Sequence, residues 1–175
     1  MIPTVSDQLQ AMRRQLTAVI IPALDPEADF ARQQALLISA TLEWLCEVHS
    51  YEYRYEVVEN LHYRELLEAL TDGASDDETA ALLTQPGPQP SEAAIALSEL
   101  ADQTIRLKER VAAIYLNGIP DDRRARAKEI ISAAARQQVE RELSWYRLTG
   151  FPGDVQLIGE ALSSGMGADH RESRC

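Results

Sequence analysis

The sequence predicts an all-α protein, an antiparallel four- to five-helix bundle with one unusually long second helix. Alanine, leucine, glutamate, glutamine and arginine dominate the chain, and apolar residues recur at helical spacing. No alternating stretch indicates a strand. The expected helices are joined by short or polar connections, which is typical of antiparallel bundles.

The first expected helix spans residues 6–21 and has one apolar face. That face contains Val5, Leu9, Met12, Leu16, Val19 and Ile20. A turn bracketed by two prolines follows, in which Asp25 is placed to cap the second helix. No helix breaker then occurs before Asp72, so the second helix is expected to continue for roughly 70 Å if straight. A helix of that length should bend or need a partner.

Residues 72–90 combine turn formers, acids and prolines, which predicts an exposed connection with one short helical turn near residues 78–83. Ser91 is expected to cap the third helix. This helix should end at Gly118, which is expected to adopt the left-handed C-cap conformation.

Asp121 is expected to cap a fourth helix that reaches about residue 148, and a short helix should follow over residues 154–162. The chain is long enough to bury one core, so a single helical-bundle domain is expected over residues 1–164. Residues 165–175 lack apolar anchors and should form a flexible tail.

The charge and composition limit the kinds of partner. The net charge of -11 argues against nucleic acid or an anionic membrane surface, since both would repel the chain. Two cysteines, Cys46 and Cys175, supply neither a disulfide framework nor a zinc site. No apolar run approaches the ~18 residues of a membrane span, and no leader pattern precedes the first helix. We therefore expect a cytoplasmic protein.

The helix lengths also predict a homodimer. The third and fourth helices should pair with the C-terminal half of the long helix, while only the first helix covers its N-terminal half. A two-fold partner would cover the half-helices that this arrangement leaves exposed.

Ionisable side chains occupy the middle of the long helix's apolar face. The apolar residues in this sector are Phe30, Leu37, Ile38, Leu45, Val48, Tyr63, Leu66, Leu67 and Leu70. Between Val48 and Tyr63 the same sector holds His49, Glu52, Tyr55, Glu56 and Glu59. An unpaired buried charge costs several kcal/mol, so these glutamates need a cation, a proton or hydrogen-bond donors.

One interpretation is a buried polar layer that fixes helix register without chemistry. Gln138 and Arg141 interrupt the apolar stripe of the fourth helix. With that helix parallel to the second half of the long one, Arg141 would lie level with Glu59. The predicted layer comprises His49, Glu52, Glu56, Glu59, Gln138 and Arg141.

The alternative interpretation is a divalent-metal site. Glu52, Glu56 and Glu59 are spaced to converge on one cation, and oxygen ligands suit Mg²⁺ or Mn²⁺. Glu99 and Asp102 form a Glu-x-x-Asp pair on the third helix, opposite its apolar stripe.

In these motifs the chain is similar to the all-α nucleotide pyrophosphohydrolases, whose Glu-x-x-Glu and Glu-x-x-Asp pairs bind magnesium and hydrolyse nucleoside triphosphates. The similarity implies metal ligation by Glu56, Glu59, Glu99 and Asp102. It makes a Mg- or Mn-dependent nucleotide pyrophosphohydrolase the alternative function.

Other chemistry has less support in the sequence. Glu59 and His62 match one Glu-x-x-His motif of a ferritin-like di-iron centre, but that architecture needs a second motif and the remaining histidine is His170. Cys46 and His49 have no further cysteine or histidine nearby. No serine or cysteine lies near a histidine and an orienting acid, and no glycine-rich phosphate loop occurs.

Residues 8–45, QLQAMRRQLTAVIIPALDPEADFARQQALLISATLEWL, resemble a family of small uncharacterised helical bacterial proteins encoded beside aminoglycoside-phosphotransferase-like kinases and acyl-CoA dehydrogenases. The resemblance implies an accessory protein that acts alongside a partner enzyme, and it supplies no catalytic residues. We therefore expect a non-enzymatic interaction protein.

Overall fold

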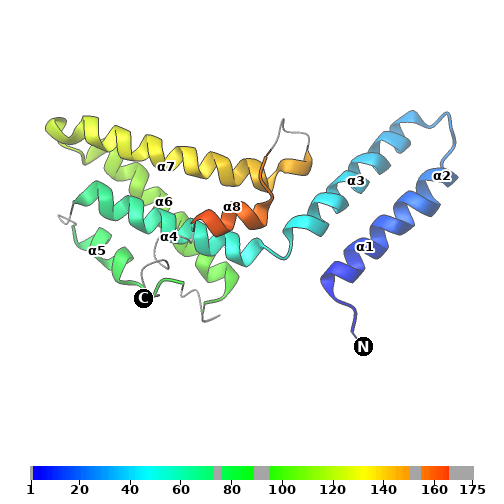
Figure 1. The fold of residues 1–175 in the computed structure, drawn as a ribbon, viewed down its shortest axis with the longest axis horizontal. Helices are drawn as coiled ribbons and strands as arrows, with labels where there is room; N and C mark the ends of the chain where they lie inside the picture. Colours follow the sequence, from blue (N-terminus) through cyan, green and yellow to red (C-terminus); the bar gives the residue numbers. More distant parts are fainter. Residues whose placement is uncertain (1, 73–75, 89–94, 150–154, 166–175) are drawn as a thin grey trace, which may run out of the picture. The chain divides into compact units, whose positions relative to one another are not determined.

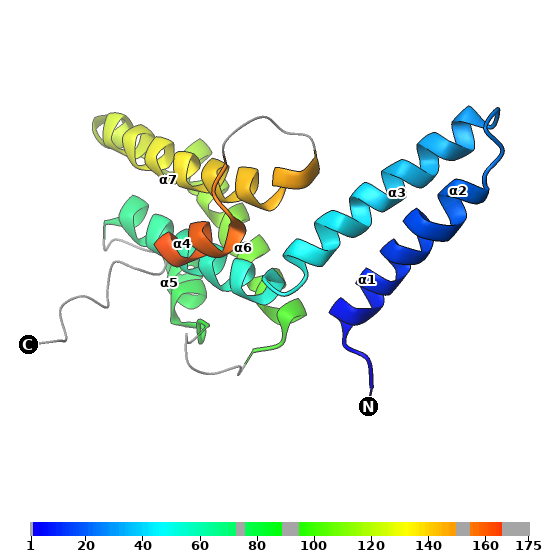
Figure 2. The same cartoon turned by 45° about the vertical axis from the view of Figure 1, so that its right-hand side comes forward.

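The computed structural model describes residues 2–72, 76–88, 95–149 and 155–165, and the regular elements in these ranges are helices, with no strand (Figures 1 and 2). The all-α prediction is confirmed. The predicted count of four to five helices is wrong, because two of the expected helices are divided into shorter segments.

The chain separates into two compact units. Unit 1 is Met1–Tyr51 with Glu142–Ile158, and unit 2 is Glu52–Arg141 with Gly159–Cys175. The expected single domain over residues 1–164 stays a prediction, since compactness does not show which parts fold together.

Unit 1 begins with a continuous helical run made of α1 (Val5–Gln15), a π-helical turn (Leu16–Ile20) and α2 (Ile21–Ala23). Thr4 and Asp7 cap α1 reciprocally, with N···O distances of 3.1 and 3.0 Å. The π-helical turn ends two residues before Pro22, which has no N–H and crowds the preceding turn. The Ile21 N–H accordingly bonds to the carbonyl of Leu16, five residues earlier.

Helix α3 (Asp29–Val48) lies beside α1 and runs in the opposite direction, so the two form a helical hairpin (Figures 1 and 2). An ion pair of 2.9 Å joins Arg13 to Glu43 across the hairpin. The expected cap, Asp25, instead accepts a 3.0 Å hydrogen bond from the Glu27 N–H and closes a turn, so α3 starts later than predicted.

The unusually long second helix that was predicted is divided in two, because α3 ends at Val48 and α4 (Glu52–Thr71) begins after a turn. In this turn the Tyr51 N–H bonds to the Val48 carbonyl at 2.8 Å, three residues back instead of four. Neither glycine nor proline causes the break. His49, Ser50 and Tyr51 are three consecutive residues of weak helix propensity, and their small costs add at this point.

Aromatic and charged contacts attach the short 3₁₀ helix Arg147–Thr149 to α3 within unit 1. The Trp44 indole donates a 2.7 Å hydrogen bond to the Trp145 carbonyl, and its ring stacks on Tyr146. Arg147 donates to both carboxylate oxygens of Glu47 at 2.8 and 2.9 Å. Such a two-point contact fixes orientation as well as distance.

Unit 2 is built on α4, α5 (Asp77–Thr84), α6 (Leu97–Asn117) and α7 (Arg124–Trp145, to Arg141 in this unit), with α8 (Ile158–Gly165) contributing its larger part. Its apolar core contains Leu66, Leu67, Leu70, Leu107, Val111, Ile119 and Ala127. The short helical turn expected near residues 78–83 is present as α5. The surrounding connection is not wholly exposed, since Thr79 is fully buried.

The helix directions in unit 2 differ from the predicted antiparallel arrangement. Asn60 contacts Thr104, while Leu70 and Ile114, both later in their helices, line one pocket. Helices α4 and α6 therefore run in the same direction, which is possible because α5 lies in the connection between them. Helix α7 runs opposite to α4, not parallel to it as expected, because Tyr63 bonds to Gln138 and Arg123 bonds to Leu70.

Two expected helix ends are also corrected. Helix α6 begins at Leu97, and the expected cap Ser91 lies outside the described residues. Gly118 has a φ of -111°, so it is not a left-handed cap. The left-handed residue is Asp72, with a φ of 53°, directly after α4. Aspartate tolerates this conformation better than most side chains.

Gly165, the first residue of the expected tail at residues 165–175, is the last residue of α8. The rest of that tail, with His170 and Cys175, and the start of the last predicted helix at residue 154 lie outside the described residues. Among the helices of the described ranges, none combines the length and the apolar character needed to cross a membrane.

Candidate functional site

Unit 2 contains a cluster of polar side chains where α4, α6 and α7 pack together. We call it the polar cluster, and it consists of Glu56, Glu59, Asn60, His62, Tyr63, Arg64, Gln103, Thr104, Lys108, Gln138 and Arg141. Several of these groups are deeply buried, and buried polar groups are costly unless they are bonded. The contribution of the cluster to stability therefore depends on which of its polar groups are paired.

Glu59 pairs with Lys108 of α6. Only 4% of Glu59 is exposed, and its Oε1 lies 2.9 Å from the Lys108 Nζ. The same ammonium lies 5.3 Å from the centre of the Tyr63 ring, a cation–π arrangement. The sequence interpretation placed Arg141 level with Glu59 and missed Lys108, which is the cation that forms the ion pair with Glu59. The available signal was that Thr104 and Lys108, four residues apart, interrupt the apolar face of α6.

Asn60 and Arg64, which the sequence interpretation also missed, link three helices. Asn60 is fully buried, donates to the Thr104 hydroxyl at 3.3 Å and accepts from the Arg64 Nε at 2.8 Å. Arg64 also donates to the carbonyls of Leu83 and Leu82, at 3.1 and 3.4 Å. These carbonyls lie at the end of α5, where they lack helical partners. Arg64 thus supplies hydrogen bonds to the free carbonyls at the end of α5 and holds this helix against α4.

The remaining acids of the predicted layer and metal site are dispersed. Glu56 is half-buried, and burial followed by the nearby charge of Glu59 raises the pKa of its carboxyl group. Glu52, expected in the buried layer, is exposed, as are Glu99 and Asp102 on α6. His49 belongs to unit 1, where its Nδ1 lies 3.0 Å from the Leu45 carbonyl.

The described part of the chain contains no group of three or more histidine, cysteine, aspartate or glutamate side chains that could hold a metal ion. Glu59, the most buried carboxylate of the predicted metal set, is neutralised by an ammonium group. The arrangement stabilises helix packing by charge pairing and hydrogen bonds.

Arg141 and His62 are the members of the polar cluster with buried nitrogens that lack a hydrogen-bond partner among the described residues. Arg141 is 5% exposed, and its Nε and Nη2 have no hydrogen-bond partner among the described residues. A buried guanidinium with unbonded N–H groups keeps much of its desolvation cost.

We therefore expect Arg141→Met to leave the free energy of unfolding within about 1 kcal/mol of wild type, or to raise it. Urea unfolding monitored by circular dichroism measures this change. A loss of about 3 kcal/mol would instead mean that Arg141 neutralises buried carboxylates, as the sequence had suggested.

His62 makes stability depend on pH. Burial, followed by the positive charge of Arg141, lowers the pKa of His62 to about 4. An unfolded chain protonates histidine near pH 6.5, so between these values the unfolded state binds more protons. Stability from His62 is therefore present above pH 6.5 and is lost as the pH falls towards 4.

We expect His62→Gln to remove part of the stability difference between pH 7 and pH 5, as measured by urea midpoints. Glu56 acts in the opposite direction, because a raised carboxyl pKa favours the folded state at low pH. His49→Gln, which removes a histidine of unit 1 outside the polar cluster, is the matched control. If His62→Gln behaves like this control, His62 is not the titrating group.

Unit 1 exposes the apolar stripes that were expected to lie in a core. On α3, Phe30 is 75% exposed, Leu37 61% and Ile38 54%. On the α1 run, Val5, Met12, Val19 and Ile20 are each about half exposed or more, and only Leu16 is buried. The contact between α1 and α3 uses a different part of each surface, which includes Leu16, Ala35 and the Arg13–Glu43 ion pair.

No protein-family model, curated protein or solved structure matches the chain.

Proposed function

We propose that the chain is a non-enzymatic helical interaction protein that pairs with a second copy of itself through the α1–α3 hairpin. The supporting observation is the exposed apolar stripe on each helix of this hairpin. Contiguous apolar surface on a folded protein is typical of an interaction site.

The energetics favour covering the hairpin. Fully burying a leucine or phenylalanine side chain is worth about 1.5–3 kcal/mol, and several such side chains lie along these helices. Two helices alone cannot enclose a core, whereas two hairpins together supply the four helices of a bundle.

A second copy fits this surface because it presents the same uncharged stripe. In a two-fold pairing each stripe meets its own equivalent, so one apolar surface is complementary to itself. The ion pair that joins the two helices of the hairpin, Arg13 with Glu43, lies within one copy and leaves both side chains partly exposed.

The molar mass in solution tests this proposal. We expect light scattering and sedimentation at micromolar concentration to give twice the 19.5 kDa chain mass. A mass of one chain at every concentration would overturn the self-pairing, and the hairpin would then need a different protein to cover it.

The accessory role rests on the resemblance of residues 8–45, which span most of the same hairpin. A protein of this kind would hold a kinase or an acyl-CoA enzyme through helical contacts. Its effect would be measured as a change in that enzyme's activity or stability, without catalysis by this chain.

The alternative, a Mg- or Mn-dependent nucleotide pyrophosphohydrolase, predicts that divalent metal ions raise the melting temperature. We expect the opposite result: EDTA-treated protein should keep its melting temperature when millimolar Mg²⁺ or Mn²⁺ is added, because Glu59 is already paired and Glu99 and Asp102 are exposed. A ligand that binds only the folded state raises the melting temperature. A rise of several degrees would favour the hydrolase, and hydrolysis of nucleoside triphosphates should then be assayed.

A further inference from the structure

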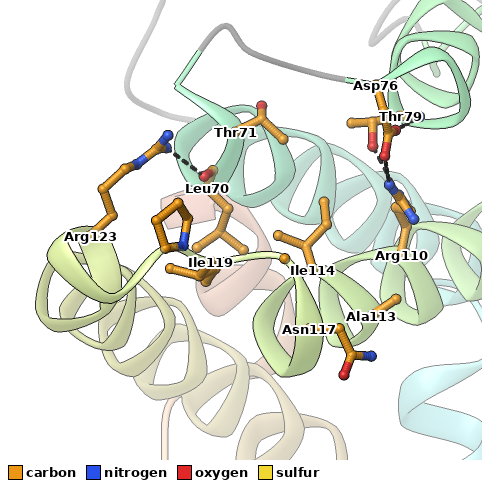
Figure 3. A pocket seen from close by; sticks show the side chains of 12 residues that line it. Leu70, Thr71, Asp76, Thr79, Arg110, Ala113, Ile114, Asn117, Ile119 and Arg123 are labelled. Carbon is orange, nitrogen blue, oxygen red and sulfur yellow. Dashed lines mark hydrogen bonds and ion pairs between the residues drawn. The ribbon is translucent and has the colours of Figure 1, made fainter.

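A pocket of about 360 Å³ lies in unit 2, where α4 and α6 end and α5 begins (Figure 3). Its volume falls within the range of roughly 300–1,000 Å³ that is typical of small-molecule sites. The turn from α6 to α7, Gly118–Ile119–Pro120, closes one side. The pocket therefore has walls from several chain segments of one compact unit.

The walls combine an apolar surface with two arginines. Leu70, Ile114 and Ile119 lie between Arg123 at one end and Arg110 at the other (Figure 3). Such a distribution suits a ligand with an apolar body and a charged end.

The two arginines differ in their availability. Arg110 is fully engaged, since it donates to Asp76, to Glu78 at 2.9 Å and to the Thr79 hydroxyl at 2.8 Å. It holds the start of α5 against α6. A ligand would have to displace two carboxylates to reach it.

Arg123 keeps most of its donors free of partners among the described residues. The structure gives its side chain one hydrogen bond, from Nη2 to the Leu70 carbonyl at 3.0 Å, and no acidic partner within the described residues. The chain has 28 acidic and 17 basic residues, so an arginine without an acidic partner among the described residues is unusual. The acid among the residues that line this pocket, Asp76, pairs with Arg110. A planar guanidinium with free N–H groups binds carboxylate or phosphate at two points.

We propose that this pocket binds a small amphipathic anion, whose carboxylate or phosphate contacts Arg123 and whose apolar body packs on Leu70, Ile114 and Ile119. This site is separate from the hairpin surface and does not depend on the proposed self-pairing. The bond to the Leu70 carbonyl holds the guanidinium in place at the pocket wall before the ligand arrives.

Titration of the full chain with hexanoate and phenyl phosphate tests the site, with amide chemical shifts as the readout. We expect both anions to shift residues around the pocket, and neutral hexanamide to bind more weakly. Inorganic phosphate alone should also bind more weakly, because it lacks the apolar body.

Variants distinguish anion binding in the pocket from a general effect of the protein's charge on anion binding. Arg123→Gln is expected to weaken binding about tenfold, with partial recovery in Arg123→Lys. Ala113→Phe places a ring in the pocket and should also weaken binding. Arg136→Gln makes the same charge change at an exposed position of α7 and should bind like wild type. Equal binding by Arg123→Gln and wild type, or binding of neither anion by wild type, would overturn the proposal.

Discussion

Replacing Lys108 with methionine is expected to lower the free energy of unfolding by about 3 kcal/mol, because it leaves the buried Glu59 carboxylate without its cation. Glu59 is 4% exposed, and its carboxylate pairs with the Lys108 ammonium at 2.9 Å. The Lys108 side chain is 38% exposed, so water reaches the cation more readily than the anion. The effect should therefore lie near the lower end of the range for broken buried pairs.

Because Glu59 is more deeply buried than Lys108, removing one partner of the pair should lower the free energy of unfolding by a different amount from removing the other. Glu59→Gln should cost less than Lys108→Met, since the lysine left behind can turn towards water. The double variant Lys108→Met with Glu59→Gln should recover much of the loss, because it leaves no unpaired buried charge. Urea unfolding of the four proteins forms a double-mutant cycle.

Lys128→Met is the matched control, since Lys128 is exposed on α7. It should stay within about 0.5 kcal/mol of wild type. If Lys108→Met unfolds at the same urea concentration as this control, the Glu59–Lys108 pair does not stabilise the polar cluster.

Leu37→Glu is expected to raise the dimer dissociation constant at least about a hundredfold, which corresponds to roughly 2.7 kcal/mol. Leu37 is 61% exposed on α3, so the charged side chain is solvated in a single copy and is buried only when two hairpins pair. Two-fold symmetry places the new charge in the interface twice, once from each copy. Phe30→Glu, at 75% exposure, should act in the same direction.

The control for this prediction is Leu116→Glu on α6. Leu116 is 73% exposed, and the substitution adds the same charge to an apolar position outside the hairpin. Sedimentation of the three variants should give one chain mass for the two hairpin variants and the wild-type mass for Leu116→Glu. Circular dichroism should show the same helix content in all of them. Unchanged dimer mass in both hairpin variants would rule out the hairpin as the interface.

The individual helices could largely be predicted because their signals are local. Apolar spacing, turn residues and caps placed α5, the end of α6 and the extent of α7 close to their observed positions. The polar break in the α4 stripe was also visible, since Glu56 and Glu59 interrupt a run of apolar residues on one face. These features depend on residues a few positions apart.

Pairing between helices was decided by tertiary structure. Arg141 and Lys108 were both cations near a polar break, but the same-direction packing of α6 on α4 brings Lys108 to Glu59. The wheel position of Leu37 resembled that of Leu67, yet Leu67 is fully buried and Leu37 is exposed. A helical wheel gives the side of a helix on which a residue lies. Whether another helix covers that side depends on contacts between residues far apart in the sequence. The three-residue turn after Val48 ends α3, so Leu37 and Leu67 lie on different helices and have different neighbours.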